Sequence, residues 1–247
     1  MARARGLARS LLIYHGLPWR RRALRRLYGQ FLGPGDLAFD VGAHVGDRTR
    51  CFAGLGARVV AVEPQPDLAA RLRRRFAGEP KVAVVDAALG ARPGRATLFL
   101  SRRTPTVTTL SARWIERVQG SAGFERVAWE DRHEVAVTTL DELIARHGRP
   151  RFCKIDVEGF EAEVLRGLSQ PLAALSIEYL PATIEVALAA VGRLAELGAY
   201  RFNLAEGERM RWLWPEWRGR RAVEDWLAMR RPGELSGDVY ARLEGHG

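Results

Sequence analysis

Three carboxylates follow apolar, strand-like runs of this chain, at positions from which side chains often act on a ligand. Asp40, Glu63 and Asp156 each come at or directly after the end of such a run. In an open α/β sheet, ligands bind outside the carboxyl ends of the strands. A carboxylate there can hold the hydroxyls of a ribose or take up a proton.

The turn after the first of these runs predicts a cofactor-binding loop. In LAFDVGAHVG, Gly42 and Gly46 let the backbone turn tightly and approach a ligand, with Ala43 and His44 between them. Seventeen residues after Gly46, Glu63 can accept hydrogen bonds from both hydroxyls of a ribose. The pair predicts a nucleoside cofactor, although a plain strand–turn–helix of an α/β protein is the alternative.

The spacing argues against a nicotinamide dinucleotide. A G-x-G-x-x-G fingerprint that starts at Gly42 needs glycines where the chain has His44 and Asp47. The pattern is instead D-x-G-x-x-x-G, with the carboxylate of Asp40 at the strand tip and no glycine bed for a pyrophosphate. S-adenosylmethionine has no phosphate and carries a sulfonium cation, so it suits this loop better and is the predicted cofactor.

Charged residues in and after the third run predict the catalytic residues. Side chains alternate faces along a strand, so Lys154 and Asp156 point the same way. Burying both is costly unless they pair or line a cleft. We expect Asp156 and Glu158 to act as general base or acceptor anchor, with Lys154 paired to Asp156 or to Glu178 on the neighbouring strand. A purely structural ion pair is the alternative.

The chain resembles the FkbM family of S-adenosylmethionine-dependent methyltransferases in five blocks. They are FDVGAHVG (39–46), VVAVEPQP (59–66), VVDAALG (84–90), TTLDELI (138–144) and CKIDVEGFEAEVLRG (153–167). The resemblance implies an α/β class I methyltransferase fold, with a Rossmann-like, mostly parallel sheet flanked by helices. It also implies O-methylation of a hydroxyl on a sugar or other small-molecule or glycan acceptor. From the third block, Asp86 and Ala87 are expected to contact the cofactor.

Two further roles follow from side-chain chemistry. His44 can be the general base, because an unperturbed pKa of about 6.5 suits proton transfer near neutral pH, or it can be a structural part of its loop. Asp156, Glu158 and Glu178 offer oxygen ligands that suit magnesium. No single strand presents a dense cluster, however, and no metal is predicted.

Length and composition fit a single methyltransferase domain over residues 1–247, with a basic helical leader at 1–34. No apolar run approaches the roughly 20 residues that cross a bilayer. Residues 11–14 are shorter than the apolar core of a signal peptide, roughly 7 to 15 residues. Cys51 and Cys153 are far apart in sequence, which indicates reduced thiols. We expect a cytoplasmic enzyme.

The formal net charge of +10 suggests a nucleic-acid partner. Only Lys81 and Lys154 of the 39 basic residues are lysine, an arginine bias that codon composition can produce without a ligand. The densest basic runs, 18–26 and 72–75, have helical patterns, which indicates solvated helix faces. We therefore expect no nucleic-acid partner. Weak contact of the helix at 19–31 with an anionic membrane or an acidic acceptor, and an RNA methyltransferase or nucleic-acid-binding function, are the alternatives.

Alternating strand and helix patterns predict the mostly parallel sheet. Strands are expected at 37–41, 58–63, 82–86, 96–100, 134–138, 152–156, 175–179, 200–204 and 238–243. Helices are expected at 67–76, 140–146, 160–168 and 182–197. Thr139 and Glu142 form a capping box for the second of these helices.

Two longer segments depart from a minimal sheet. Residues 101–133, with a short helix at 111–118, are long for a structureless connection, so they are predicted to be a lid or an acceptor-binding insertion. Residues 209–231 carry four tryptophans among arginines, at positions 212, 214, 217 and 226. Core packing of these rings is expected, and stacking on a sugar or a base is the alternative.

Overall fold

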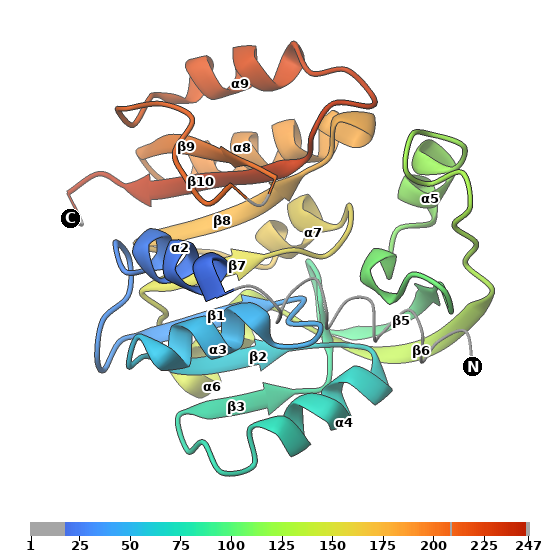
Figure 1. Ribbon diagram of the computed structural model, residues 1–247, viewed down its shortest axis with the longest axis horizontal. Coiled ribbons are helices and arrows are strands. Elements are labelled where there is room, and N and C mark those ends of the chain that lie inside the picture. The colour runs from blue at the N-terminus through green and yellow to red at the C-terminus, as the bar shows by residue number, and fades with distance from the viewer. Residues whose placement is uncertain (1–17, 208, 246–247) are drawn as a thin grey trace.

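The computed structural model describes residues 18–207 and 209–245 and contains a seven-stranded sheet (Figure 1). The strand order is β3-β2-β1-β7-β8-β10-β9. The first five of these strands are parallel, whereas β10 is antiparallel to both of its neighbours. The strands are β1 (Leu37–Val41), β2 (Arg58–Val62), β3 (Val82–Val85), β7 (Phe152–Ile155), β8 (Ala174–Tyr179), β9 (Tyr200–Glu206) and β10 (Gly237–Leu243).

Helices cover both faces of this sheet, which confirms the predicted α/β fold with a Rossmann-like, mostly parallel sheet. The face toward the viewer in Figure 1 carries α2 (Pro18–Tyr28), α3 (Asp47–Gly54) and α4 (Pro66–Arg75). The other face carries α6 (Leu140–His147), α7 (Glu161–Arg166), α8 (Ile184–Leu197) and α9 (Arg220–Ala228). The parallel strands point to the right in Figure 1, toward α5 (Ala112–Val118) and a second, small sheet.

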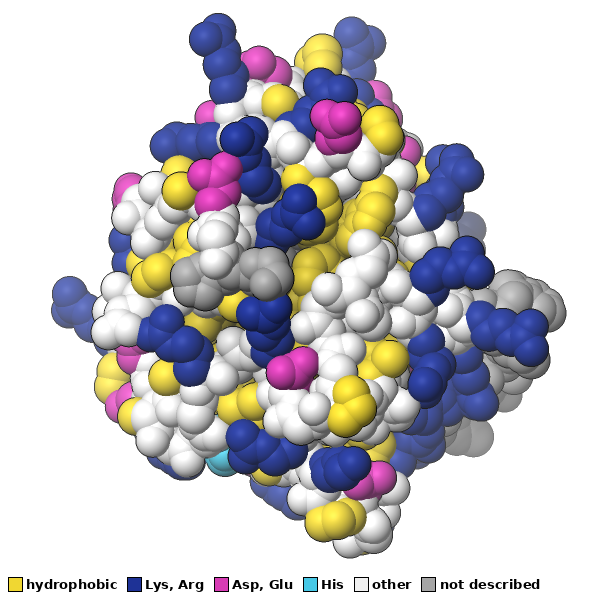
Figure 2. Space-filling model, turned by 90° about the vertical axis from the view of Figure 1, so that its left-hand side faces the viewer, with side chains coloured by type: hydrophobic (Ala, Val, Ile, Leu, Met, Phe, Trp, Pro, Cys, Tyr) yellow, Lys and Arg dark blue, Asp and Glu magenta, His cyan; other side chains and the backbone are white. Residues whose placement is uncertain are grey.

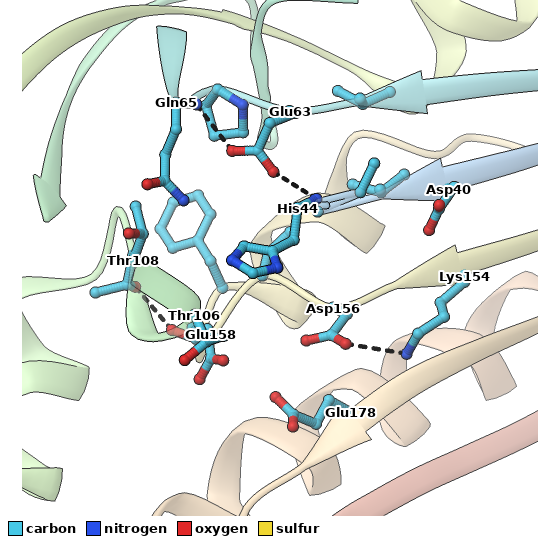
Figure 3. A pocket seen from close by; sticks show the side chains of 18 of the residues that line it. Asp40, His44, Glu63, Gln65, Thr106, Thr108, Lys154, Asp156, Glu158 and Glu178 are labelled. Carbon is cyan, nitrogen blue, oxygen red and sulfur yellow. Dashed lines mark hydrogen bonds and ion pairs between the residues drawn. The ribbon is translucent and has the colours of Figure 1, made fainter. Parts of the chain in front are cut away.

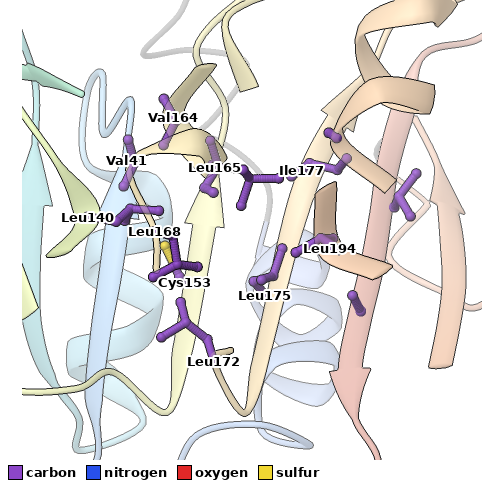
Figure 4. Close-up of a cluster of buried hydrophobic side chains, with 14 of the residues drawn as sticks. Val41, Leu140, Cys153, Val164, Leu165, Leu168, Leu172, Leu175, Ile177 and Leu194 are labelled. Atoms are coloured by element: carbon purple, nitrogen blue, oxygen red, sulfur yellow. The ribbon is translucent and has the colours of Figure 1, made fainter. Parts of the chain in front are cut away.

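The alternation of side chains along β7 places a lysine in the interior. Cys153 and Ile155 join the apolar cluster that packs against α6, α7 and α8 (Figure 4). On the opposite face, Phe152 packs with Tyr28 of α2 and other rings. Lys154 shares the face of Phe152 and is only 2% exposed. The sheet therefore holds a charged side chain next to an aromatic layer, and that charge must be compensated nearby.

Two expected strands form a separate small sheet. β5 (Gly94–Leu100) and β6 (Asp131–Thr138) are antiparallel, and β4 (Ala88–Leu89) joins β6. With two residues, β4 is too short to show the alternation by which a strand is recognised in sequence. The predicted N-cap is confirmed, because the Thr139 hydroxyl accepts a hydrogen bond from the Glu142 N–H at 3.1 Å. The Glu142 carboxylate accepts a hydrogen bond from the Thr138 hydroxyl.

The described part of the expected basic leader is integral to the core. α2 buries Leu24, Leu27 and Tyr28 to 2% exposure or less. After it, Phe31 stacks on Phe152 with ring centres 4.8 Å apart. Residues 1–17 of the predicted leader lie outside the described residues. No helix within 18–207 and 209–245 is long and apolar enough to cross a membrane.

The tryptophan-rich segment packs against the core, as expected. Trp212 contacts Trp217 and Tyr240 edge-on, with ring centres 5.2 and 4.9 Å apart. Trp214 and Trp226 pack against the apolar cluster on the opposite face. None of these four rings lines the cavity at the carboxyl ends of the strands.

Candidate functional site

The carboxyl ends of β1, β2, β7 and β8 surround a cavity of about 280 Å³ (Figure 3). Residues of the small sheet and of the segment 105–110 also line it. The cavity brings together most of the site residues that the sequence predicts, namely Asp40, Gly42, Ala43, His44, Glu63, Ala87, Lys154, Asp156, Glu158 and Glu178. Gly46 and Asp86 do not line it.

The loop after β1 is fixed between its two neighbouring strands. The N–H groups of Gly42 and Ala43 donate to the carbonyl oxygen of Val62, at 2.9 and 3.0 Å. Gly42 has φ +81°, and a Cβ there would lie 1.8 Å from the backbone oxygen of Asp156. Only glycine allows this close approach. The glycine therefore joins the loop after β1 to the turn after β7.

Glu63 is held in place by backbone donors. Its carboxylate accepts hydrogen bonds from the N–H of His44 at 2.8 Å and from the N–H of Gln65 at 2.9 Å. Burial raises the pKa of Glu63 to about 7, although these two bonds oppose the shift. Asp40, in β1, is also buried, and it accepts a hydrogen bond from the Thr49 hydroxyl at 2.5 Å.

The two predicted cofactor residues outside the cavity make other contacts. Gly46 begins α3 at φ +79°, and an added Cβ there would lie 2.8 Å from Leu72 of α4. The side chain of Asp86 is 39% exposed and pairs with Arg73 at 3.3 Å. Gly46 thus sets the packing of α3 on α4, and Ala87 rather than Asp86 faces the cavity.

Three carboxylates converge on the side of the cavity opposite Glu63. Asp156, Glu158 and Glu178 each bring an oxygen within 4.8 Å of the others, and Figure 3 shows their side chains pointing toward one another. Glu158 has left-handed backbone geometry, with φ +54°, which costs a non-glycine residue roughly 1–3 kcal/mol. Its carbonyl oxygen accepts a hydrogen bond from the Thr109 hydroxyl at 2.7 Å, so the segment between β5 and β6 supports this turn.

Lys154 compensates one of these carboxylates and a second one that the sequence did not reveal. Its ammonium lies 3.1 Å from Asp156 and 2.9 Å from Asp238. Burial alone would lower the pKa of Lys154, but the two carboxylates raise it well above its usual value. Lys154 therefore stays charged. The expected pairing with Asp156 is confirmed, and the second partner is Asp238 rather than Glu178.

Asp238 could be predicted as a site residue only if the direction of β10 in the sheet were known. β10 is antiparallel to β8, so its amino end, not its carboxyl end, reaches the edge where the parallel strands finish. Asp238 is the second residue of β10 and lies opposite Glu178 in the ladder. A charged residue at the start of the antiparallel strand therefore lies at the same edge of the sheet as one at the end of a parallel strand.

The protein environment shifts the pKa values of the three clustered carboxylates in different directions. Burial alone would raise the pKa of Asp156, but the charge of Lys154 and hydrogen bonds from Lys154 and Glu178 lower it. Burial, followed by the charge of Asp156, raises the pKa values of Glu158 and Glu178 well above the usual value. Asp156 is therefore ionised, whereas Glu158 and Glu178 are stronger proton acceptors once ionised.

Part of the segment predicted as a lid or an acceptor-binding insertion lines the cavity, and the segment has a small core of its own. It contains a 3₁₀ turn (Pro105–Val107) and α5 (Ala112–Val118). Val107 and Trp114 pack together there. The Gln65 side-chain amide donates to the Pro105 carbonyl oxygen at 3.1 Å, which ties the segment to the turn after β2.

His44 is placed as a neutral group between the two sides of the cavity. Figure 3 shows its ring between Glu63 and Asp156. Burial lowers the pKa of His44 to about 4, while the charge of Asp156 opposes the shift. A neutral imidazole can accept a proton, but one with so low a pKa is a weak base at neutral pH.

The charge of the lining favours a cationic ligand. Seven acidic side chains line the cavity, against Arg48 and Lys154 as the basic ones. A sulfonium or ammonium group is attracted to such a site, and a phosphate is repelled. The converging oxygens of Asp156, Glu158 and Glu178 are also of the type that holds a divalent cation. This cluster comes from two strands, which is why no single run of sequence displayed it.

Comparison with known proteins identifies the family. Hexuronic acid methyltransferase AglP of Haloferax volcanii is 26% identical over 166 residues, which cover 64% of this chain and 63% of that protein. Precorrin-6y C5,15-methyltransferase of Geobacter metallireducens is similar in structure, with a TM-score of 0.49, 12% identity and coverage of 91% and 87% of the two chains. An S-adenosylmethionine-dependent O-methyltransferase of Thermotoga maritima has a TM-score of 0.40, 11% identity and coverage of 92% and 65%. Residues 40–200 match the methyltransferase FkbM domain, and the chain therefore belongs to the FkbM family of methyltransferases.

Proposed function

We propose that this protein transfers a methyl group from S-adenosylmethionine to a hydroxyl of a sugar or glycan acceptor. The observation that carries the proposal is the placement of Asp156, Glu158 and Glu178 within 4.8 Å of one another at the carboxyl ends of β7 and β8. A hydroxyl acceptor must lose its proton, and these carboxylates can bind the hydroxyl and take up that proton.

The residues around the β1 loop fit the proposed methyl donor. Bound S-adenosylmethionine would supply an electrophilic methyl group on a sulfonium leaving group. Glu63 is oriented by two backbone donors and has lone pairs left for ribose hydroxyls. Asp40 and the acidic lining suit the cationic parts of the donor. The basic side chains that line the cavity are Arg48 and Lys154, and Lys154 is already paired with Asp238. The lining therefore offers little positive charge for a pyrophosphate.

Each residue of the acidic cluster has a distinct proposed role. Lys154 keeps Asp156 ionised, so that Asp156 can accept a hydrogen bond from the acceptor hydroxyl and orient it. Glu178 donates a hydrogen bond to Asp156 and so carries a proton. Glu158, in its ionised form, then takes the proton, because its raised pKa makes it the stronger base. Orientation of the reacting oxygen can supply roughly 7–11 kcal/mol in favourable cases.

A sugar is the acceptor that the chemistry of the cavity supports best. The relative from Haloferax volcanii is named for a hexuronic acid acceptor. Sugar hydroxyls can donate hydrogen bonds to the carboxylates of the cavity. A hexuronic acid carries one negative charge on a sugar ring, whereas RNA carries one on every nucleotide and is therefore repelled more strongly. We therefore place RNA methylation second.

Calorimetry tests the donor, and product analysis tests the acceptor. We expect S-adenosylhomocysteine to bind and NAD not to bind. Mass spectrometry after incubation with S-adenosylmethionine and a fractionated host metabolite and glycan extract should show a mass gain of one methylene in a sugar. Tight binding of NAD alone, or specific methylation of RNA under the same conditions, would overturn the proposal.

Variants separate donor binding from proton transfer. Asp156→Asn and Glu158→Gln are expected to lower turnover by roughly 10²-fold or more, the range for loss of a general base, with affinity for S-adenosylhomocysteine within a few-fold of wild type. Normal turnover in a folded double variant would remove both residues from the mechanism and leave Glu178 and His44 as candidates.

We expect turnover to survive EDTA, because Lys154 already provides the positive charge beside Asp156. Loss of turnover with EDTA and its recovery with Mg²⁺ would make the cluster a cation site instead.

A further inference from the structure

Three neighbouring helices carry nearly all of the chain's excess positive charge. α2, α3 and α4 together contain eleven arginines and two aspartates, a net +9 out of the formal +10 of the whole chain. α2 alone has five arginines and no acidic residue. The remaining residues of the chain together have a formal charge of only about +1. The charge is therefore concentrated on the face formed by these helices, called the basic face below, and is not an even bias of composition.

The exposed arginines of the basic face form one continuous surface. Residues 21, 22, 25 and 26 of α2 and residues 73–75 of α4 are exposed. α3 lies between the two groups. Its Asp47 pairs with Arg20 of α2 and with Arg50 of α3, and Leu72 of α4 packs against the start of α3 at Gly46. Figure 2 shows Lys and Arg side chains crowded along its right-hand edge, which corresponds to the face toward the viewer in Figure 1.

The protein leaves much of this charge uncompensated. Asp47 is buried and pairs with Arg20, Arg48 and Arg50. Four exposed arginines differ from these: Arg21, Arg22, Arg26 and Arg74. Their side chains make no ion pair or hydrogen bond with any residue of 20–207 and 209–245. Like charges held together on a surface attract an anionic partner over several ångströms.

We propose that the basic face docks on an anionic lipid membrane surface. Such a surface is broad and carries dispersed negative charge, so it can meet arginines on several helices at once without a groove or a defined binding pocket. The segment 101–133 lies at the right of Figure 1, and the cavity lies at the carboxyl ends of the strands, so both are beside this face and not beneath it.

A membrane fits the basic face better than a nucleic acid does. Proteins that bind single-stranded nucleic acid combine basic grooves with aromatic rings that stack on bases. Among residues 20–207 and 209–245, the large apolar side chains that are exposed are Met229 and Leu235, and neither belongs to α2, α3 or α4. The neighbouring cavity is lined mainly by carboxylates, so an RNA chain held on the basic face would be repelled from the site of methyl transfer.

Vesicle co-sedimentation of the full chain tests the proposal without any need for activity. The probes are vesicles of phosphatidylcholine alone and of phosphatidylcholine with about 30% phosphatidylserine, the kind of anionic surface that attracts basic segments. We expect binding to the anionic vesicles only, and loss of binding at about 0.5 M NaCl, where exposed charges are screened. Failure of the proposed methyl transfer would not affect this result.

Matched variants assign the binding to the basic face. The patch variant changes Arg21, Arg22, Arg26 and Arg74 to Gln, and the control variant changes the exposed Arg92, Arg146, Arg151 and Arg231 to Gln. Both lower the net charge equally. We expect the patch variant to bind anionic vesicles roughly ten-fold or more weakly, and the control variant to bind within about two-fold of wild type. Absence of vesicle binding in the wild type, or equal losses in both variants, would overturn the proposal. So would tight binding of single-stranded RNA that the patch variant alone loses while vesicle binding is weak.

Discussion

Glu63 makes the proposed contact with the methyl donor sensitive to pH. Its pKa is raised by burial to about 7, so it changes from the acid to the carboxylate near neutral pH. A carboxylate accepts hydrogen bonds more strongly than a carboxylic acid does. We therefore expect the affinity for S-adenosylhomocysteine to rise several-fold between about pH 6 and pH 8, as Glu63 ionises.

The matched variant for this prediction is Glu63→Gln, which has nearly the same size and no charge. It should bind S-adenosylhomocysteine more weakly at pH 8 and with little change at lower pH. Calorimetry at several pH values measures both proteins. The same pH dependence in the variant would assign the effect to another group.

Lys154 is expected to matter more for stability than either of its partners. Removing it in Lys154→Met leaves Asp156 and the largely buried Asp238 without their cation, and breaking a buried pair in this way costs about 3–5 kcal/mol. Asp238→Asn leaves Lys154 paired with Asp156 and keeps an oxygen for its hydrogen bond, so the loss should be smaller. Urea unfolding of both variants gives the two free energies. A larger loss in Asp238→Asn would mean that Asp238, not Lys154, is the essential partner.

The sequence reveals this ion pair only in part, and the reason is geometric. Lys154 and Asp156 are two residues apart on one strand, so alternation places them on the same face. Asp238 is 84 residues further along the chain than Lys154, and nothing in local spacing connects them. The antiparallel direction of β10 brings them together. Similarly, Asp86 follows β3 in sequence much as Glu63 follows β2, but its side chain pairs with Arg73 at the surface instead of facing the cavity.

At the scale of elements, the turn after β1 is the part of the site least tolerant of change. A Cβ on Gly42 would lie 1.8 Å from the backbone oxygen of Asp156, so Gly42→Ala must push the β1 and β7 turns apart. We expect a lower melting temperature and loss of S-adenosylhomocysteine binding, measured by thermal unfolding and calorimetry.

Gly35→Ala is the matched control for this substitution. Gly35 has a similar left-handed backbone, with φ +87°, but no atom lies within 4 Å of its added Cβ. It should lose only the roughly 1 kcal/mol that left-handed geometry costs a residue with a Cβ. If the two variants are equally destabilised and both still bind the ligand, the contact between the two turns has no role in the site.

Elements with a clear period were predictable, and those defined by tertiary pairing were not. β1, β2 and β7 are short apolar runs that end in polar residues, and each lies within a residue or two of its predicted bounds. The small sheet differs, because β5 and β6 look like strands of any sheet until their pairing with each other is known. Its separation from the main sheet depends on contacts that local sequence does not encode.

At the scale of the whole molecule, the two faces of the sheet bury different ends of the chain. Leu27 of α2 is 2% exposed and belongs to the cluster on one face, whereas Leu227 of α9 is fully buried in the cluster on the other. β7 contributes to both clusters, through Phe152 on one side and Ile155 on the other. Loss of packing at either end of the chain should therefore destabilise the same central strands.

The prediction of a single domain follows from this shared sheet, and calorimetric unfolding tests it. Leu27→Ala and Leu227→Ala should each cost about 2–5 kcal/mol, which for a chain of this size lowers the melting temperature by roughly 4–20 °C. We expect one transition in the wild type, and in both variants we expect that whole transition to move. If Leu27→Ala instead splits the curve and leaves an unshifted second transition, α2 and its cluster form a unit that unfolds separately from the α6–α9 face. One shifted transition in each variant would mean that the two clusters are coupled through the central strands that also hold Lys154 and the site.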